Sequence, residues 1–293
     1  MSASLTAVDL FYNTYANFTE TVSQAVREEA FGEDIGQNSW VTAAEYRQFI
    51  EWLGLTPASQ VLEVASGSGG PAIHLARSTG CRVTGVDVNP FGIATARRAA
   101  AHAGVSRVAF EVCDATLPLP FADGKFDALL CIDSMNHLPN RQKTLLDWRR
   151  VMKPDARAVF TDPVVLTGIV TNEELAQRSS IGLFAFAPRA LNEEMIVAAG
   201  FTLVEQLDMT ESAALVSRRW REARQRFRGD LLRIEGEERF EGVQKFLAAV
   251  HRLTSERRLS RIAYVVENPA RPDIRGAAGT GGRALSTRDQ LTL

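Results

Sequence analysis

The sequence predicts an α/β protein built on a doubly wound, mostly parallel sheet of seven strands, with helices before it and a helical insertion over it. Short apolar, β-branched segments alternate with helical segments from residue 60 onwards. Glycines end several of these segments, as at Gly80, Gly104 and Gly200. Because the connections are short, the alternation implies parallel strands wound in both directions from the middle of the sheet.

Each predicted element follows from length and residue type. Strands are expected where apolar and β-branched residues form short runs, at 60–65, 82–87, 107–112, 126–132, 156–162, 201–208 and 260–267. Helices are expected between these strands, at 71–78, 91–103, 141–152 and 189–199. The segment 211–257 breaks the alternation with a strongly helical composition and a turn near residues 235–236.

The ends of the chain differ from this regular middle. Residues 5–31 have helical spacing, 30–40 resemble a loop, and a helix over 42–53 begins at a capping Thr42. We therefore expect a helical lid over 1–57 and a binding domain over 58–268, with cap insertions at 163–189 and 211–257. Residues 269–293 have too little apolar content to fold alone and are expected to be a disordered tail.

Composition limits the function. The net charge of −2, from 33 basic and 35 acidic residues, gives no general attraction to nucleic acid or anionic membranes. There is no 18-residue apolar run, and the first residues lack the basic start and apolar core of a signal peptide. Cys81, Cys113 and Cys131 are unclustered and suit free, buried thiols in a reducing cytoplasm, with no metal site. A homo-oligomer remains compatible with this composition.

The segment 60–76 organises the chain. A buried strand leads to a turn with Gly67, Gly69 and Gly70, and Pro71 follows where a first-turn helix position is expected. A strand that delivers a ligand to a helix N-terminus is the geometry of a nucleotide site. The dinucleotide fingerprint G-x-G-x-x-G is incomplete, because its third glycine would fall on Ala72.

Acidic residues lie at the carboxyl ends of three predicted strands, where ligands of such sheets bind. Glu63 precedes Gly67 and Gly69 in the pattern acid-x-x-x-G-x-G, and Asp87 ends the next strand. This arrangement resembles motifs I and II of class I S-adenosyl-L-methionine (SAM)-dependent methyltransferases, with their Rossmann-like fold, although that family usually has glycine where this chain has Ala65.

The resemblance implies that Asp87 binds the ribose hydroxyls and that Asp114 accepts the adenine amino hydrogens. Each acid has a plainer alternative as a helix cap or turn former, but that alternative must explain all three together. The predicted cofactor-binding residues are Glu63, Ala65, Gly67, Gly69, Asp87, Val88, Asp114, Ala115, Asp133 and Trp40.

His137 is the main candidate for chemistry on the methyl acceptor. It follows the fourth strand, where the acceptor should lie, and a neutral imidazole can take a proton near pH 7. Asp133 and Asn136 are placed to orient it or to hold the substrate. The alternative is a helix-entry loop with a capping histidine. Aromatic residues of the N-terminal segment are expected either to close over the site or to pack in a core; they are Tyr12, Tyr15, Phe18 and Trp40.

Four segments narrow the resemblance: FGEDIG, SGSGGPA, DSMNH and TDP. They are similar to small-molecule methyltransferases that act on amines, including the sarcosine/dimethylglycine and phosphoethanolamine N-methyltransferases. The latter carry an aspartate and a histidine four residues apart after strand four, as Asp133 and His137 are here, and pair that histidine with an N-terminal tyrosine. Tyr15 is the candidate for this tyrosine, with Tyr12 as the alternative.

The leading hypothesis is a SAM-dependent methyltransferase of a small molecule. An amine or hydroxyl acceptor is favoured. Phe184 and Phe186 could line an apolar pocket for a natural-product acceptor, so this class of acceptor and C-methylation are kept as alternatives. The competing classes are an NAD(P)-dependent oxidoreductase and a non-catalytic SAM-binding protein. The arginine run over 218–228 is interpreted as a solvated helix, whereas Arg178 or Arg189 is able to bind a substrate carboxylate or phosphate.

Overall fold

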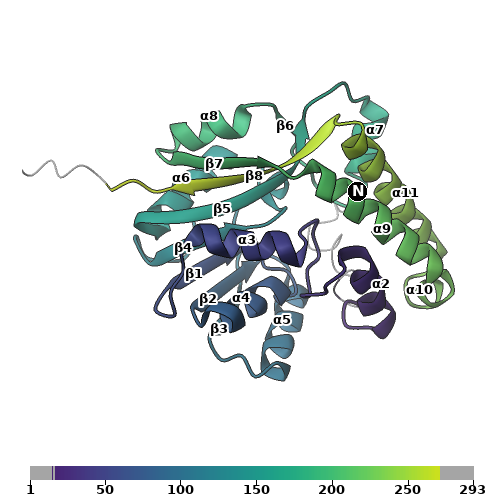
Figure 1. Ribbon diagram of the computed structural model, residues 1–293, viewed down its shortest axis with the longest axis horizontal. Coiled ribbons are helices and arrows are strands. Elements are labelled where there is room, and N and C mark those ends of the chain that lie inside the picture. The colour runs from purple at the N-terminus through teal and green to yellow at the C-terminus, as the bar shows by residue number, and fades with distance from the viewer. Residues whose placement is uncertain (1–14, 16, 271–293) are drawn as a thin grey trace, which may run out of the picture.

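The computed structural model of the chain describes residue 15 and residues 17–270. Its strands are β1 (Gln60–Val64), β2 (Arg82–Asp87), β3 (Val108–Val112), β4 (Phe126–Cys131), β5 (Met152–Leu166), β6 (Ala187–Pro188), β7 (Thr202–Asp208) and β8 (Leu259–Glu267). They form one sheet in the order β3-β2-β1-β4-β5-β8-β7, with β6 paired to β5 (Figure 1). Strands β1 to β6 pair in parallel, and β8 is antiparallel to both β5 and β7. The predicted doubly wound, mostly parallel sheet is confirmed.

Helices cover both faces of this sheet. They are α2 (Thr21–Phe31), α3 (Ala43–Leu53), α4 (Gly70–Thr79), α5 (Pro90–His102), the 3₁₀ turn η1 (Met135–His137), α6 (Arg141–Val151), α7 (Asn172–Arg178), α8 (Leu191–Ala198), α9 (Thr210–Arg226), α10 (Arg228–Glu235) and α11 (Glu237–Ser255). Phe49, Ile73 and Ile93 pack α3, α4 and α5 on one face (Figure 1). Trp148 and Ile196 pack α6 and α8 on the other. The strands between these layers are therefore apolar on both sides, as parallel strands require.

Two boundaries differ from the prediction. Strand β5 starts directly after α6 and runs for 15 residues, so the first part of the predicted cap insertion at 163–189 continues the sheet. Strand β6 is an eighth strand of only two residues. It is too short for the alternation of apolar and polar residues that predicts a strand. The helical stretch 211–257 has the expected break at Gly236 and a second one at Phe227.

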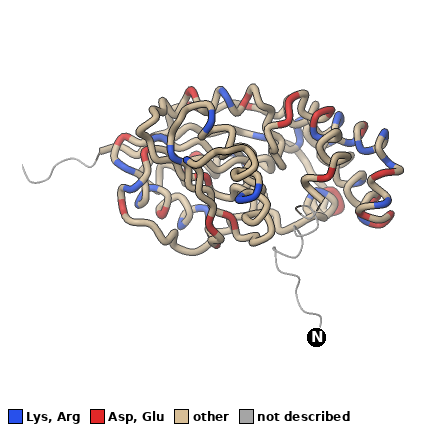
Figure 2. Tube along the Cα trace, turned by 90° about the horizontal axis from the view of Figure 1, so that it is seen from below, with Lys and Arg blue, Asp and Glu red and all other residues tan. Residues whose placement is uncertain are grey.

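Helices α2, α9, α10 and α11 pack together beyond the carboxyl ends of the strands (Figure 1). Figure 2 shows acidic and basic residues interspersed along this group. Arg226 pairs with Glu29 and Arg218 lies near Glu222, as expected for a solvated helix. Arg224 is an exception, because it is buried and paired with Glu235.

Some expectations lie outside the described residues, namely those for Tyr12 and for nearly all of the tail at 269–293. Within residues 15 and 17–270, no helix has both the length and the apolar character needed to cross a membrane.

Candidate functional site

A cavity of about 410 Å³ lies at the carboxyl ends of β1, β2 and β4. This volume is in the usual range for small-molecule sites. Nearly all of the predicted site residues line it: Tyr15, Glu63, Ala65, Gly67, Asp87, Val88, Asp114, Ala115, Asp133 and His137. The side chains predicted from separate strand ends therefore meet in one place.

The structure does not place Trp40 and Gly69 at the cavity. The Trp40 ring packs in the helical cap against Trp220 and Phe246, with centroids 5.9 and 6.1 Å away. Gly69 caps α4 in a left-handed conformation, and a Cβ there would lie 2.5 Å from Phe110. Neither residue is in the cavity lining, and both pack against other parts of the fold. Their assignment as direct cofactor ligands is therefore corrected.

The glycine loop has left-handed backbone at Ala65 and Gly67, with φ of 59° and 54°. Ala65 thus adopts a left-handed conformation that favours glycine, at a steric cost of about 1–2 kcal/mol. A Cβ on Gly67 would lie 2.7 Å from the Tyr15 hydroxyl oxygen. Tyr15 is therefore seated directly on the loop.

The N-terminal loop also packs on the glycine loop, through Gly70. A Cβ at Gly70 would lie 2.3 Å from the Ile35 carbonyl oxygen and 2.4 Å from that of Gly36. This contact brings Asn38 and Ser39 to the cavity wall. Sequence reasoning missed these two polar residues, and the second glycine of FGEDIG was the signal that could have found them.

Asp87 is held by the backbone around it. Its Oδ2 accepts a hydrogen bond from the Gly67 amide and its Oδ1 accepts one from the Asn89 amide, each at 2.8 Å. Burial raises the pKa of Asp87, while these two amides act to lower it. Each carboxylate oxygen has two lone pairs, so the side chain can still accept bonds from a ligand.

Glu63 contributes a buried carboxyl group to the cavity wall. Its Oε2 atom is buried and has no hydrogen-bond partner among the described residues. Burial raises its pKa from the usual 4.5 to about 8. An unpartnered carboxyl at the wall of a cavity is a group that a bound donor or cation would satisfy.

We expect Glu63→Gln to stabilise the ligand-free protein near pH 8. Because the folded pKa is raised, the wild type loses stability as pH rises from 4.5 to about 8, and the glutamine variant does not. The gain should be on the order of 1–3 kcal/mol at pH 8 and vanish near pH 4. Urea titrations of both proteins across this pH range measure it; a pH-independent difference would contradict the assignment.

The rim of the cavity beyond β2 and β3 is more open. Asp114 is exposed, and its Oδ1 accepts bonds from the Thr116 amide and hydroxyl at 2.9 and 2.7 Å. Val88 and Ala115 complete this rim. Cys113 lies beside them, only half buried, and burial raises the pKa of its thiol. Cys81 and Cys131 are buried free thiols as predicted, whereas Cys113 faces the site.

Asp133 lines the cavity and also holds neighbouring segments together, so its assignment to catalysis and cofactor binding stays a prediction. Its Oδ1 accepts bonds from Arg261 Nε and Thr161 Oγ1, both at 2.7 Å. Its Oδ2 accepts one from the Trp40 amide at 2.8 Å. The carboxylate thus joins the tips of β4, β5 and β8 to the N-terminal loop.

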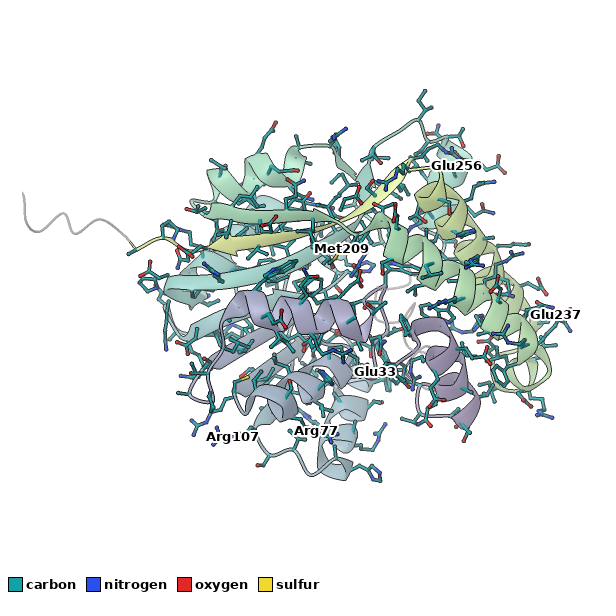
Figure 3. The ribbon with its side chains drawn as sticks, in the orientation of Figure 1. Glu33, Arg77, Arg107, Met209, Glu237 and Glu256 are labelled. Carbon is teal, nitrogen blue, oxygen red and sulfur yellow. The ribbon has the colours of Figure 1, made fainter. Side chains whose placement is uncertain are left out.

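Arg261 completes this network and was not anticipated from the sequence. Its side chain is fully buried, and its Nη1 donates to Glu45 Oε1 at 3.1 Å. Met209, which Figure 3 labels where β7 leads into α9, lies 3.7 Å from the same nitrogen through its sulfur. Burial acts to lower the pKa of Arg261, but Asp133 and Glu45 raise it overall.

His137 lies at the cavity on the 3₁₀ turn after β4. Its Nδ1 is 2.7 Å from the Leu183 carbonyl oxygen, and since a carbonyl only accepts, Nδ1 carries the proton. The Asn136 amide nitrogen donates to Nε2 at 3.1 Å. Burial and then the nearby charge of Arg178 lower the pKa of His137, against the opposing effect of Leu183. The imidazole is therefore neutral at pH 7, with its accepting lone pair on Nε2, where the Asn136 amide donates.

Tyr15 lies on the glycine loop. Its contacts are with Gly67, Gly92 and Asn38, and burial followed by the charge of Asp87 raises its pKa. These residues belong to the glycine loop and its neighbours. Tyr15 thus lies against the glycine loop in the same cavity as His137, and its assignment to acceptor chemistry stays a prediction.

Comparison with known proteins agrees with this geometry. Residues 55–199 match the family model of a methyltransferase domain. Methyltransferase GfsG of Streptomyces halstedii is 38% identical over 119 residues, which are 40% of this chain and 42% of GfsG. Sarcosine/dimethylglycine N-methyltransferase of Halorhodospira halochloris is 34% identical over 111 residues, covering 38% of this chain and 39% of that protein. The chain therefore covers less than half the length of either relative.

A solved structure supports the fold over a longer span. Haemonchus contortus phosphoethanolamine N-methyltransferase 2, in complex with phosphomonomethylethanolamine and S-adenosylhomocysteine, matches 91% of this chain and 61% of its own with a TM-score of 0.78 and 19% identity. The resemblance to methyltransferases of this kind is confirmed. Over residues 55–199 the chain is therefore similar to methyltransferase domains.

Proposed function

We propose that this protein transfers a methyl group from S-adenosyl-L-methionine to a small-molecule acceptor. One observation carries the proposal: Glu63, Asp87 and Asp114, from three neighbouring strands, line a single cavity beside the glycine loop. The methyltransferase match over residues 55–199 gives the same reaction class.

The residues of the cavity fit the cofactor group by group. Asp87 is left with free lone pairs for ribose hydroxyls, and Asp114 reaches the rim where an adenine amino group needs an acceptor. The orphaned Glu63 oxygen suits the ammonium of the methionine part. When bound, the cofactor supplies a methyl group on a positively charged sulfonium. The protein then has to align the acceptor with that methyl group and exclude water.

The acceptor side is formed by His137, Leu138 and Leu183. A neutral imidazole with its lone pair on Nε2 is able to take a proton from a hydroxyl or an ammonium. We therefore favour an amine or hydroxyl acceptor. The three cysteines are free thiols, in keeping with the reducing cytoplasm where we expect the protein to act.

The competing oxidoreductase hypothesis has less support. Ala72, which stands where a third fingerprint glycine would be required, lies buried inside α4. Asp114 at the rim has no function in that class. A protein that binds SAM without transferring its methyl group is the other alternative, and measured turnover decides it.

Asp87→Ala should weaken SAM binding by about 1.5–3 kcal/mol, or roughly 10- to 150-fold, because charge-assisted hydrogen bonds to the ribose are lost. Calorimetric titrations of SAM, S-adenosylhomocysteine and NADH into wild type and variant measure this. Asp127→Ala is the matched control, since Asp127 also accepts a backbone amide, that of Gln60 at 2.9 Å, but at the other end of the sheet. Unchanged SAM affinity in Asp87→Ala, or tight binding of NADH by the wild type, would overturn the proposal.

A further inference from the structure

A smaller cavity, of about 320 Å³, lies between helix α6 and the loop that follows β3. Residues 115–118 of the loop form one wall, and one face of α6 between Lys143 and Arg150 forms the other. We call this cavity the α6 groove. It adjoins the candidate cofactor cavity, because Ala115 and Thr116 line both. The reaction proposed above uses none of the α6 residues that line it.

Hydrogen bonds fasten the loop wall of the α6 groove at both ends. At one end, Asp114 accepts the Thr116 amide and hydroxyl at 2.9 and 2.7 Å. At the other, Asp147 accepts the Leu119 amide at 2.7 Å, and Arg150 donates to the Leu119 carbonyl oxygen at 2.8 Å. Arg150 Nε also donates to Asp147 at 2.8 Å, so these two charges offset each other. The groove is therefore preformed, and its one acidic side chain is already engaged.

Trp148 brings to the groove a buried donor that lacks an acceptor. The residue lines the groove and is only 1% exposed, and its Nε1 has no hydrogen-bond partner among the described residues. Its ring is held edge-on to that of Phe160, with centroids 5.8 Å apart. An indole N–H only donates, and leaving a buried donor unpaired costs about 1–3 kcal/mol. An occupant of the groove with an oxygen acceptor removes this cost.

The other lining residues indicate the chemical class of such an occupant. Lys143 is exposed at the groove and its charge is not offset by Asp147, which pairs with Arg150. The two basic residues and one acidic residue of the lining therefore leave one positive charge. Leu117 and Leu146 line the groove and are 61% and 48% exposed, so apolar surface lies open on both walls. This combination suits an anion that carries an apolar body.

We propose that the α6 groove binds a small carboxylic acid with an apolar body. The carboxylate accepts a hydrogen bond from Trp148 Nε1 and faces the ammonium of Lys143, while the apolar part lies between Leu117 and Leu146. This site goes beyond the proposed function and does not depend on it. Because Ala115 and Thr116 belong to both cavities, the ligand borders the rim at which Asp114 lies.

The test titrates phenylacetate into the full-length protein, with phenylacetamide as an uncharged probe of the same shape. Calorimetry gives the affinities, and nuclear magnetic resonance of isotope-labelled protein follows the indole N–H of Trp148, identified by its absence from Trp148→Phe. We expect phenylacetate to bind the wild type at least tenfold more tightly than phenylacetamide and to shift the Trp148 signal.

Two variants separate the contributions to binding. Trp148→Phe keeps an aromatic ring but removes the donor, and should weaken phenylacetate binding roughly 10- to 100-fold. Lys143→Met should weaken it about 2- to 5-fold, because this charge is exposed to solvent. Lys245→Met is the matched control, since Lys245 is an exposed lysine on α11, and it should behave as wild type.

The remaining outcomes decide against the proposal. If Trp148 only packs the core, Trp148→Phe will change the unfolding midpoint and leave phenylacetate affinity unchanged. Equal affinities for phenylacetate and phenylacetamide, or binding of neither, also overturn the proposal. Lys143→Met keeps the test decisive if Trp148→Phe does not fold, and an unchanged affinity in Lys143→Met then overturns it. Failure of S-adenosylhomocysteine to bind, titrated separately, counts against the proposed function alone.

Discussion

Replacing Arg261 with methionine should lower the free energy of unfolding by about 3–5 kcal/mol, because it breaks a buried ion pair. The substitution keeps the volume of the side chain but leaves Asp133 as a buried carboxylate without its cation. Thr161 and the Trp40 amide continue to donate to Asp133, and two neutral donors do not replace a guanidinium. Urea titration with linear extrapolation measures the loss.

A matched control tests whether the large effect comes from burial of the ion pair or from ion pairing as such. Arg47 also bridges to a glutamate, Glu33, at 3.0 Å, but both side chains are about half exposed. Arg47→Met should therefore change stability little, because water and salt screen exposed ion pairs. Adding Asp133→Asn to Arg261→Met should recover part of the loss, since it removes the stranded charge. Equal, small effects of Arg261→Met and Arg47→Met would show that the buried ion pair of Arg261 with Asp133 does not stabilise the fold.

The sequence predicted the parts of the site that local pattern determines. Glu63, Asp87 and Asp114 each follow or end an apolar run, and the carboxyl ends of parallel strands meet at one edge of a sheet. The same reasoning placed His137 at the cavity, because it comes directly after β4. The topology of a parallel sheet alone therefore predicts that residues at the carboxyl ends of the strands lie at the ligand-binding edge. No knowledge of side-chain contacts is needed.

Contacts between distant segments could not be predicted in this way. Asp133 was assigned to chemistry because it follows the fourth strand four residues before His137, whereas its ion-pair partner Arg261 is 128 residues away and could not be identified from local sequence. Trp40 was expected at the cavity, yet periodicity does not tell which of two neighbouring cores an aromatic ring enters. Which residues pack together across the fold depends on tertiary structure, and local sequence patterns do not contain that information.

His137→Ala should reduce kcat by roughly 10²–10⁴ with an amine or hydroxyl acceptor, the range for removal of a general base. The effect should fall on kcat more than on KM, because the proton moves only as the methyl group is transferred. Stopped assays with labelled SAM and a panel of amines, phenols and phosphate- or carboxylate-bearing amines measure it. His251→Ala is the control, since His251 also lies near a carbonyl oxygen, that of Ala214 at 3.0 Å, but within the cap.

The pH profile separates a general base from a residue that only positions the acceptor. Burial and Arg178 lower the pKa of His137, so the wild type should keep its activity as pH falls to about 6.5 and lose it only below that value. Asn136→Asp places a carboxylate 3.1 Å from Nε2 in place of the amide, which should raise the pKa of the imidazole. The acid limb of kcat should then move to higher pH by about one unit or more. A limb that stays in place in this variant, or that persists in His137→Ala, would assign the proton transfer to another group and leave His137 with alignment alone.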